Sequence, residues 1–507
     1  MEFVWVEPVI CTSYGSANGP ALLSLFLRRR WLCLVLQGDC PVKSAPRLLC
    51  GTAILAVVFG TIATSMAEQE TGDELVQLVV NLLNDKDKDV RALGLEQVRT
   101  EAKGQAATRQ FAAQLSKLPP EVQVGLLSAL ADRGDSAARP AVLSVLAAAR
   151  DEPVRVAAIA AVGFLGEPAD LRTLVPLLTA GSQAEQAAAR TSLIRLPGQS
   201  VPGAIAAEMK QAPQSLRVIL IGILATRRAL DAVPDILPAA VAAEPSVRAA
   251  AMAALGQLAG PEHLPGMVQG VLLAEKGRER EAAEKAVMLV CSRIADVARQ
   301  AEPLLVAMDR LKRADRTTIL PTLGRVGGPA ALKNVTAAIT DTDPLLHETG
   351  LRALCNWPDA SIASRLTALA RTDEHPEHRT MALRALIRIA PLPDGRTDGE
   401  KLELLQQALT LCTRNAERNL VLQRASAIRI PETLRFLTPY LDQRPYAQQA
   451  CESVVELAHH RDLREPNKAE FDRALDKVIQ TSQDATVMDR ANRYKKGQTW
   501  ARPTVPE

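Results

Sequence analysis

The densest group of side chains that could do chemistry is the run Asp373-Glu374-His375-Pro376-Glu377-His378. Two imidazoles three residues apart, with carboxylates beside them, are of the types that hold a divalent metal ion. However, Pro376 breaks a helix between the two histidines, and the run stands where other parts of the chain place a polar turn. Since a confined turn rarely supplies three or four convergent ligands, we expect a polar turn here and no metal site.

Motifs of the common enzyme classes are absent from the sequence. It contains no G-x-x-x-x-G-K-[ST], G-x-G-x-x-G, H-E-x-x-H or G-x-S-x-G. It has no C-x-x-C pair either, and the cysteines after the first 67 residues are Cys291, Cys355, Cys412 and Cys451. Each falls within or beside an expected helix, where small buried thiols are common. We therefore predict no catalytic residue, no cofactor and four free, buried cysteines.

The charge balance argues against a nucleic-acid partner. The chain carries 60 Lys and Arg against 57 Asp and Glu, a formal net charge of +3. Proteins that bind DNA or RNA usually carry a basic excess or a basic stripe. A recurring arginine, described below, could form such a stripe, but ion-pair networks are the commoner use of such residues.

Residues 151–180 show the unit on which most of the chain is built. Asp151 is a good N-cap, Pro153 suits a first helical turn, and small apolar residues follow at steps of three and four. The turn 166–168, Gly-Glu-Pro, then ends this helix and opens a Leu-rich helix over 169–179. Two helices of this length cannot bury a core alone, so the unit is stable only when copies of it stack.

Copies of this unit recur with a period near 31 residues. We define the slot as the position of Val154 within its unit and locate the corresponding residue in each other unit. Most slots are recognised by residue type, whereas Glu185, Glu279, Asp315 and Glu417 are placed by the period alone. The slot residues are Val90, Val122, Val154, Glu185, Leu216, Val247, Glu279, Asp315, Leu346, His378, Glu417 and Tyr446.

The next position is arginine in eight of these twelve units: Arg91, Arg155, Arg217, Arg248, Arg280, Arg316, Arg379 and Arg418. Together with Ala-Leu-Gly at 92–94, Ala-Val-Gly at 161–163 and Ala-Leu-Gly at 254–256, this pattern resembles HEAT repeats, in particular the short variety found in phycobilisome-lyase-type HEAT proteins. The resemblance covers roughly residues 73–480. It implies that arginines such as Arg91, Arg155, Arg217 and Arg248 are structural and join carboxylates such as Asp89 and Asp151 between layers.

The resemblance implies an all-α fold, a right-handed α-solenoid of about twelve stacked helix pairs over residues 68–458. We expect a helical C-terminal cap over 459–496 and a disordered tail over 497–507. The composition agrees with an all-α chain, because aromatic residues make up only 3% of it and alternating β-branched runs are scarce.

In HEAT repeats the positions two, five, six and ten residues past the slot face the concave side and are usually charged. Here they are apolar in the first half of the chain and polar or basic in the second. We therefore predict a partner-binding surface with the candidates Val156, Ile159, Phe164, Val218, Ile221, Met252, Arg352, Arg384 and Arg388. Two arrangements of the apolar members stay open, an exposed groove for an amphipathic segment or burial within a tightly coiled superhelix.

The first 67 residues carry a leader with no repeat character. Lys43 and Arg47 precede an apolar run, and the small residues Ser65 and Ala67 form a cleavage site, which is the layout of a signal peptide within residues 42–67. We expect the mature chain to begin at Glu68 and consider Val42 a candidate for the true start. The alternative is an uncleaved anchor over residues 48–66.

These features predict a non-enzymatic protein-interaction scaffold of the cell envelope, periplasmic or secreted, that binds a protein or peptide along its concave surface. We expect a monomer that meets the membrane only through an uncleaved leader. One alternative is a docking or regulatory subunit of an exported enzyme. HEAT-type lyases and DNA glycosylases are disfavoured because they act in the cytoplasm and because large stacking residues are few: only Trp357 and Trp500 are tryptophans after the leader.

Overall fold

The computed structural model describes residues 74–500, which form helices joined by short turns with no β-strand among them. The predicted all-α fold is confirmed for this part of the chain. The predicted signal peptide, the alternative anchor at 48–66 and residues 501–507 of the predicted tail lie outside the described residues. Within 74–500, no helix has the length and apolar character needed to cross a bilayer.

A helical stretch at 74–83 is followed by two alternating sets of helices. The first helix of each pair carries the predicted slot in its first turn or at its N-cap, including the four polar slot residues that were placed by period alone. These first helices are α2 (Lys88–Thr100), α4 (Pro120–Arg133), α6 (Glu152–Leu165), α8 (Gln183–Arg195), α10 (Gln214–Thr226), α12 (Pro245–Leu258), α14 (Arg278–Cys291), α16 (Arg313–Val326), α18 (Pro344–Cys355), α20 (Pro376–Ile389), α22 (Asn415–Ala425) and α24 (Ala447–His459).

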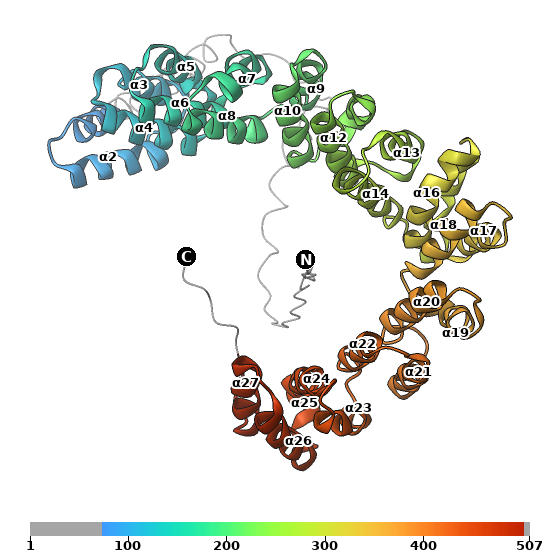
Figure 1. Ribbon diagram of the computed structural model, residues 1–507. Coiled ribbons are helices and arrows are strands. Elements are labelled where there is room, and N and C mark those ends of the chain that lie inside the picture. The colour runs from blue at the N-terminus through green and yellow to red at the C-terminus, as the bar shows by residue number, and fades with distance from the viewer. Residues whose placement is uncertain (1–73, 501–507) are drawn as a thin grey trace, which may run out of the picture. The chain divides into compact units, whose positions relative to one another are not determined.

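The second helices lie between them in the chain (Figure 1). They are α3 (Gln105–Ala112), α5 (Arg139–Ala148), α7 (Leu171–Ala180), α9 (Val201–Gln211), α11 (Val233–Ile236) with the 3-10 turn η5 (Leu237–Val241), α13 (Leu264–Leu273), α15 (Glu302–Asp309), α17 (Pro329–Ile339), α19 (Ala363–Thr372), α21 (Asp398–Leu411) and α23 (Pro431–Leu437) with η9 (Thr438–Asp442). Each first helix packs against the next one along the chain, from α2 to α24, so these helices form one continuous layer.

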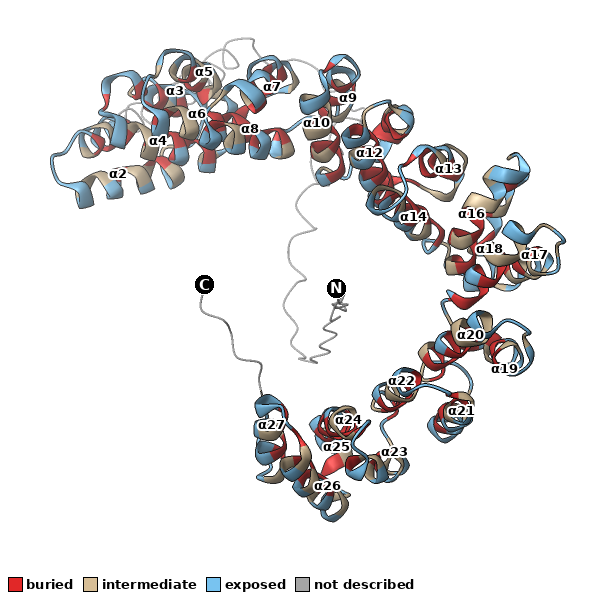
Figure 2. Cartoon of the chain, in the orientation of Figure 1, coloured by how far each residue is buried: buried red, intermediate tan, exposed pale blue. Residues whose placement is uncertain are grey.

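After α24 the chain adds α25 (Arg461–Arg464), α26 (Lys468–Thr481) and α27 (Ala485–Lys495), and both α26 and α27 pack against α24. The buried residues lie on the faces that neighbouring helices share, as the colouring in Figure 2 shows. The four cysteines of the described region are buried and free, as predicted. Burial raises the pKa of the Cys291 thiol to about 12, so it stays protonated and unreactive at neutral pH.

The arginines that follow the slot bind carbonyls at the end of the preceding helix or in the turn that follows it. We call these eight residues the turn arginines. Because the last carbonyls of a helix have no partner within it, a guanidinium with five donors can satisfy several of them at once. The carbonyls are those of Asp85 and Lys86 for Arg91, Leu146 for Arg155, Ala212 for Arg217, Ala242 and Ala243 for Arg248, Leu272 and Ala274 for Arg280, Asp309 and Leu311 for Arg316, Asp373 and Glu374 for Arg379, and Cys412 for Arg418.

The carboxylates that pair with the turn arginines in the structure are not the ones expected from the sequence. Arg155 pairs with Glu185, and Arg248 pairs with Glu279 at 2.9 Å, so each reaches the slot glutamate of the next unit. The expectation that Asp151 makes this contact is wrong. Its carboxylate instead accepts the backbone N–H of Val154 at 3.1 Å and caps α6.

A second set of arginines joins consecutive first helices, and sequence reasoning missed it. We call these the bridging arginines. Each lies at or near the end of one first helix and donates to carbonyls at the end of the preceding first helix. The pairs are Arg133 with Val98, Glu101 and Ala102; Arg227 with Leu193, Ile194 and Leu196; Arg293 with Gly256 and Ala259; Arg388 with Cys355 and Trp357; and Arg424 with Arg388.

Arg227→Met should destabilise the chain by about 2 kcal/mol, because three carbonyls at the end of α8 lose charged hydrogen bonds of 2.6–3.0 Å. The measurement is the urea midpoint of unfolding. Arg172→Met is the matched control, since Arg172 is exposed on α7 and makes no hydrogen bond or ion pair in the described structure. Its effect should stay within about 0.5 kcal/mol. Equal effects of the two variants would contradict a structural role for the bridging arginines.

Gly163 sets how closely α6 approaches α8. A Cβ at this position would lie 2.7 Å from the Cα of Ser192, whose hydroxyl donates to the carbonyl of Ile159 at 2.8 Å. We expect Gly163→Ala to destabilise by roughly 1–3 kcal/mol despite the better helix propensity of alanine. A Cβ at Gly203 on α9 would have no atom within 4 Å, so Gly203→Ala should instead stabilise the folded protein by about 0.5–1 kcal/mol. Urea unfolding of both variants gives the sign of each change.

Candidate binding groove

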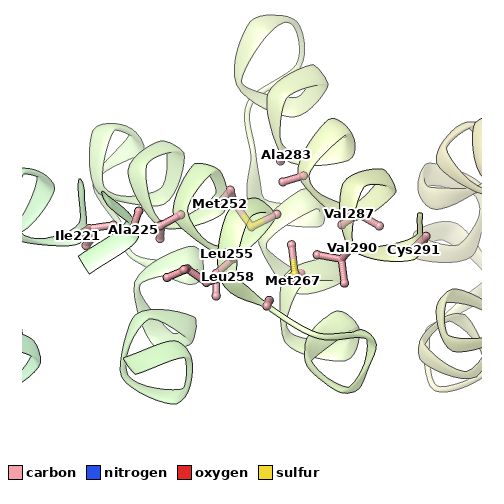
Figure 3. Packing of buried hydrophobic residues seen from close by; sticks show 14 of the residues in the cluster. Ile221, Ala225, Met252, Leu255, Leu258, Met267, Ala283, Val287, Val290 and Cys291 are labelled. Atoms are coloured by element: carbon pink, nitrogen blue, oxygen red, sulfur yellow. The ribbon is translucent and has the colours of Figure 1, made fainter. Parts of the chain in front are cut away.

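The predicted apolar end of the binding surface belongs largely to the core. Ile159 and Ile221 are 0% exposed and Met252 is 2% exposed, so of the two arrangements left open for these residues, burial is the one observed and the exposed groove is excluded. Figure 3 shows Ile221 and Met252 in the continuous packing of buried side chains. The position five residues past the slot turns inward because adjacent first helices pack along that side. Val156 and Val218 are half-buried.

Phe164 is the exception among the apolar candidates, with 47% of its surface exposed. The guanidinium of Arg195, from the end of α8, lies 5.3 Å from the centre of its ring. This cation–π contact covers one ring face and joins two layers. Phe164 is therefore a single exposed side chain rather than part of an apolar patch formed with the other candidates.

The three basic candidates differ in what they contact. Arg352 is 65% exposed and pairs with Glu348 of its own helix at 2.7 Å. Arg384 pairs with the buried Glu417 of α22 at 2.8 Å while half of its side chain stays exposed. Arg388 is a bridging arginine. The structure brings Arg384 and Arg388 together in one groove and leaves Arg352 outside it.

This groove has a volume of about 630 Å³ and follows one face of α20. Its α20 residues recur at steps of three and four over twelve positions, so they span roughly 18 Å at 1.5 Å per residue. The end of α18 and the N-cap of α22 close its sides. We call it the α20 groove; its lining residues are Cys355, Asn356, Pro376, Glu377, Thr380, Met381, Arg384, Ala385, Arg388 and Arg414.

The lining of the α20 groove is positively charged. Arg384, Arg388 and Arg414 stand against one lining carboxylate, that of Glu377. Burial lowers the pKa of Arg388, and the nearby Arg424 guanidinium adds to this effect by repulsion. The charged form of a guanidinium that is buried and repelled in this way is stabilised more by a bound anion than that of an exposed guanidinium, because the anion supplies a nearby opposite charge.

Glu417 holds two of the three guanidinium groups in place. It is 1% exposed and accepts from Arg384 at 3.0 Å and from Arg414 at 2.9 Å and 3.1 Å. Burial alone would raise the pKa of this carboxyl, but the hydrogen bonds from the two arginines outweigh burial and leave its pKa below the ordinary value. Sequence reasoning missed Arg414, although its spacing of three residues before Glu417 at a helix start is a usable signal.

A larger cavity of about 860 Å³ lies between α14, α16 and α18, and its lining holds three carboxylates against four basic side chains. Arg325 bonds the buried Glu284 at 2.8 Å, and Arg313 bonds Asp341 at 2.8 Å and reaches Asp343, one of the lining carboxylates, at 3.7 Å. Arg280 donates to the backbone carbonyls of Leu272 and Ala274, and Glu281 is the remaining acidic residue of the lining. The lining of this cavity is therefore closer to neutral than that of the α20 groove.

The polar turn beside this groove differs from expectation in one respect. Asp373, His375 and His378 bring one ligand atom each to within 4.8 Å of one another, although we expected no convergence of ligands in this turn. No other group of three His, Cys, Asp or Glu residues in the described region meets this condition.

Comparison with known proteins finds one family model that matches part of the chain. Residues 108–194 match the family model for HEAT repeats. No curated protein matches the sequence. Among solved structures, karyopherin Kap121p bound to the SUMO protease Ulp1p is similar with a TM-score of 0.46 and 12% identity, over 88% of this chain and 55% of that chain. Kap121p bound to Nup53p is similar with a TM-score of 0.46 and 12% identity, over 83% of this chain and 53% of that chain.

The chain thus spans about half the length of the karyopherins it matches. The matched segment, 108–194, runs from α3 through α8, and the same alternation of first and second helices continues through the rest of the described residues. The match to HEAT repeats in sequence is thus confined to residues 108–194, and the rest of the described chain resembles them in its pairing of helices.

Proposed function

We propose that the protein is a non-enzymatic scaffold that binds an acidic segment of a partner protein in the α20 groove. One observation carries the proposal, the alignment of Arg384, Arg388 and Arg414 along a groove of roughly 18 Å with a single lining carboxylate. That span accommodates about six residues of extended chain. Stacked helix pairs expose long surfaces of this kind, and such surfaces are where repeat proteins bind their partners.

Arginine suits this role because its planar group can bind a carboxylate through two parallel hydrogen bonds. The three guanidinium groups are also held before a partner arrives. Glu417 fixes Arg384 and Arg414, and two backbone carbonyls of the preceding layer fix Arg388. Side chains that are already ordered lose less conformational entropy on binding, so more of the electrostatic attraction remains as affinity.

A peptide of about eight residues with consecutive glutamates should bind the full chain more tightly than its glutamine counterpart, since the groove takes about six extended residues. Arg384→Gln should weaken binding of the glutamate peptide by about tenfold, because one charged hydrogen-bonding partner is lost. Thr380→Trp fills the groove without altering its charge and should weaken binding as well. Isothermal titration calorimetry measures each affinity.

Arg299→Gln is the control, because Arg299 is also an exposed arginine, at 65% against 51% for Arg384, and pairs with one glutamate, Glu302, outside the groove. Its peptide affinity should equal that of the unaltered protein. Circular dichroism identifies any variant that has lost its fold. If Arg384→Gln and Arg299→Gln have the same effect, or if both peptides bind equally, the α20 groove is not the binding site.

We also propose that this scaffold acts outside the cytoplasm, on the basis of the signal-peptide pattern within residues 42–67. Export would bring the groove to partners of the cell envelope or the secreted fraction. N-terminal sequencing of protein isolated from those fractions should then find a chain that begins at Glu68. A purified chain that retains residues 48–66 would support the anchored alternative instead, and recovery from the cytoplasm alone would overturn export.

A further inference from the structure

We propose that Asp373, His375 and His378 form a binding site for a zinc-class divalent cation at the turn between α19 and α20. Asp373 is the C-cap residue of α19, His375 is the N-cap residue of α20, and His378 is the third residue of α20. Imidazole nitrogens and a carboxylate oxygen are the ligand types that such ions bind. The site lies outside the lining of the α20 groove, so it does not depend on the function proposed above.

Two of the three distances between the ligand atoms are close to those that one ion requires, and the third, between the two imidazoles, is within 4.8 Å. Asp373 Oδ1 lies 3.2 Å from His378 Nδ1 and 3.5 Å from His375 Nδ1. Ligands bound to a tetrahedral ion at about 2.0–2.1 Å are separated from one another by roughly 3.3–3.4 Å. Only small rotations of the side chains would therefore direct all three atoms at a common centre.

A supporting residue orients the second imidazole. The other ring nitrogen of His378, Nε2, lies 3.0 Å from Glu348 Oε2 on α18, and Glu348 is held in turn by Arg352 at 2.7 Å. Histidines that bind metals in proteins characteristically direct their second nitrogen at a carboxylate, which fixes the ring and makes it a better ligand. The contact also ties the site to the neighbouring layer.

The exposure of the three residues fits entry of an ion from solvent. Asp373 and His378 have side chains that are 13% and 14% exposed, whereas that of His375 is 69% exposed. Two ligands are thus fixed by packing, and the third can close over the ion. The open side leaves a fourth position for water, as in zinc sites with three protein ligands.

A turn of the same kind elsewhere shows what a purely structural histidine does. His263 lies in the turn before α13, where its Nδ1 accepts the backbone N–H of Gly260 at 3.1 Å and one carboxylate, that of Glu262, lies 3.2 Å away. In that turn a single imidazole accepts the backbone hydrogen bond. The turn at 373–378 has a second one, and three of the chain's six histidines are in ring contact there, since His378 contacts both His347 and His375.

The test is titration of the full chain, freed of metal by a chelator, with Zn²⁺ in competition with a chromophoric chelator. The unaltered protein should bind one equivalent, and His375→Ala should weaken that binding by at least tenfold, because one of three ligands is lost. Since His375 is exposed, this variant should fold normally. His263→Ala is the matched control and should bind Zn²⁺ as tightly as the unaltered protein does.

Two further measurements separate a metal ligand from a turn-forming residue. Saturating Zn²⁺ should raise the melting temperature of the unaltered protein and leave that of His375→Ala unchanged, since only a ligand that binds the folded state stabilises it. Glu348→Gln should weaken Zn²⁺ binding without abolishing it, as expected for a positioning residue. Equal Zn²⁺ affinity in His375→Ala and the unaltered protein, or the absence of a one-equivalent site, would overturn the proposal.

Discussion

Unpaired backbone carbonyls at helix ends are the constraint on which this structure depends. Every helix leaves its last four carbonyls without partners inside the helix, and a chain of many short helices repeats that problem at each turn. The turn arginines satisfy carbonyls that precede their own helix, and the bridging arginines satisfy those of the preceding first helix. A solenoid is held together by contacts between neighbouring layers, and these arginines add hydrogen bonds to the apolar packing found there.

This use of arginine also shapes the candidate binding groove. Arg388 is fixed by the carbonyls of Cys355 and Trp357 at the end of α18, and the same guanidinium lines the α20 groove. A bridging arginine therefore supplies part of the positive charge that a partner would meet. Glu417 acts in a similar way, because it is buried between layers and keeps Arg384 and Arg414 in position. Stacking of the layers and preparation of the groove are achieved by the same contacts.

The features that the sequence predicts well are those that repeat. The period of the slot located the first helices even where the slot residue is a glutamate. A glutamate is accommodated there because Glu185 and Glu279 each pair with the turn arginine of the preceding unit. Exposure was harder to predict. Ile159 and Phe164 lie on one helix five residues apart, yet the first is buried and the second is exposed, because the rotation of a helix against its neighbours decides which side turns inward.

Contacts that do not follow the period could not be predicted from it. The bridging arginines stand at no constant distance from the slot, as Arg293 follows the end of α14 whereas Arg388 lies within α20. Arg414 lies before its slot rather than after it. The convergence of Asp373, His375 and His378 depends on the backbone path of one turn and on Glu348 from another layer, and neither can be read from the spacing of the residues.

The groove and the candidate metal site meet at one boundary between layers, that of α18 and α20. Arg388 crosses this boundary to the carbonyls at the end of α18, and His378 crosses it to Glu348 near the start of the same helix. In a solenoid each layer is coupled mainly to its nearest neighbours, and any ligand that binds only the folded state stabilises the interface that it spans. An ion at His378 would therefore strengthen the α18–α20 interface that also positions Arg388.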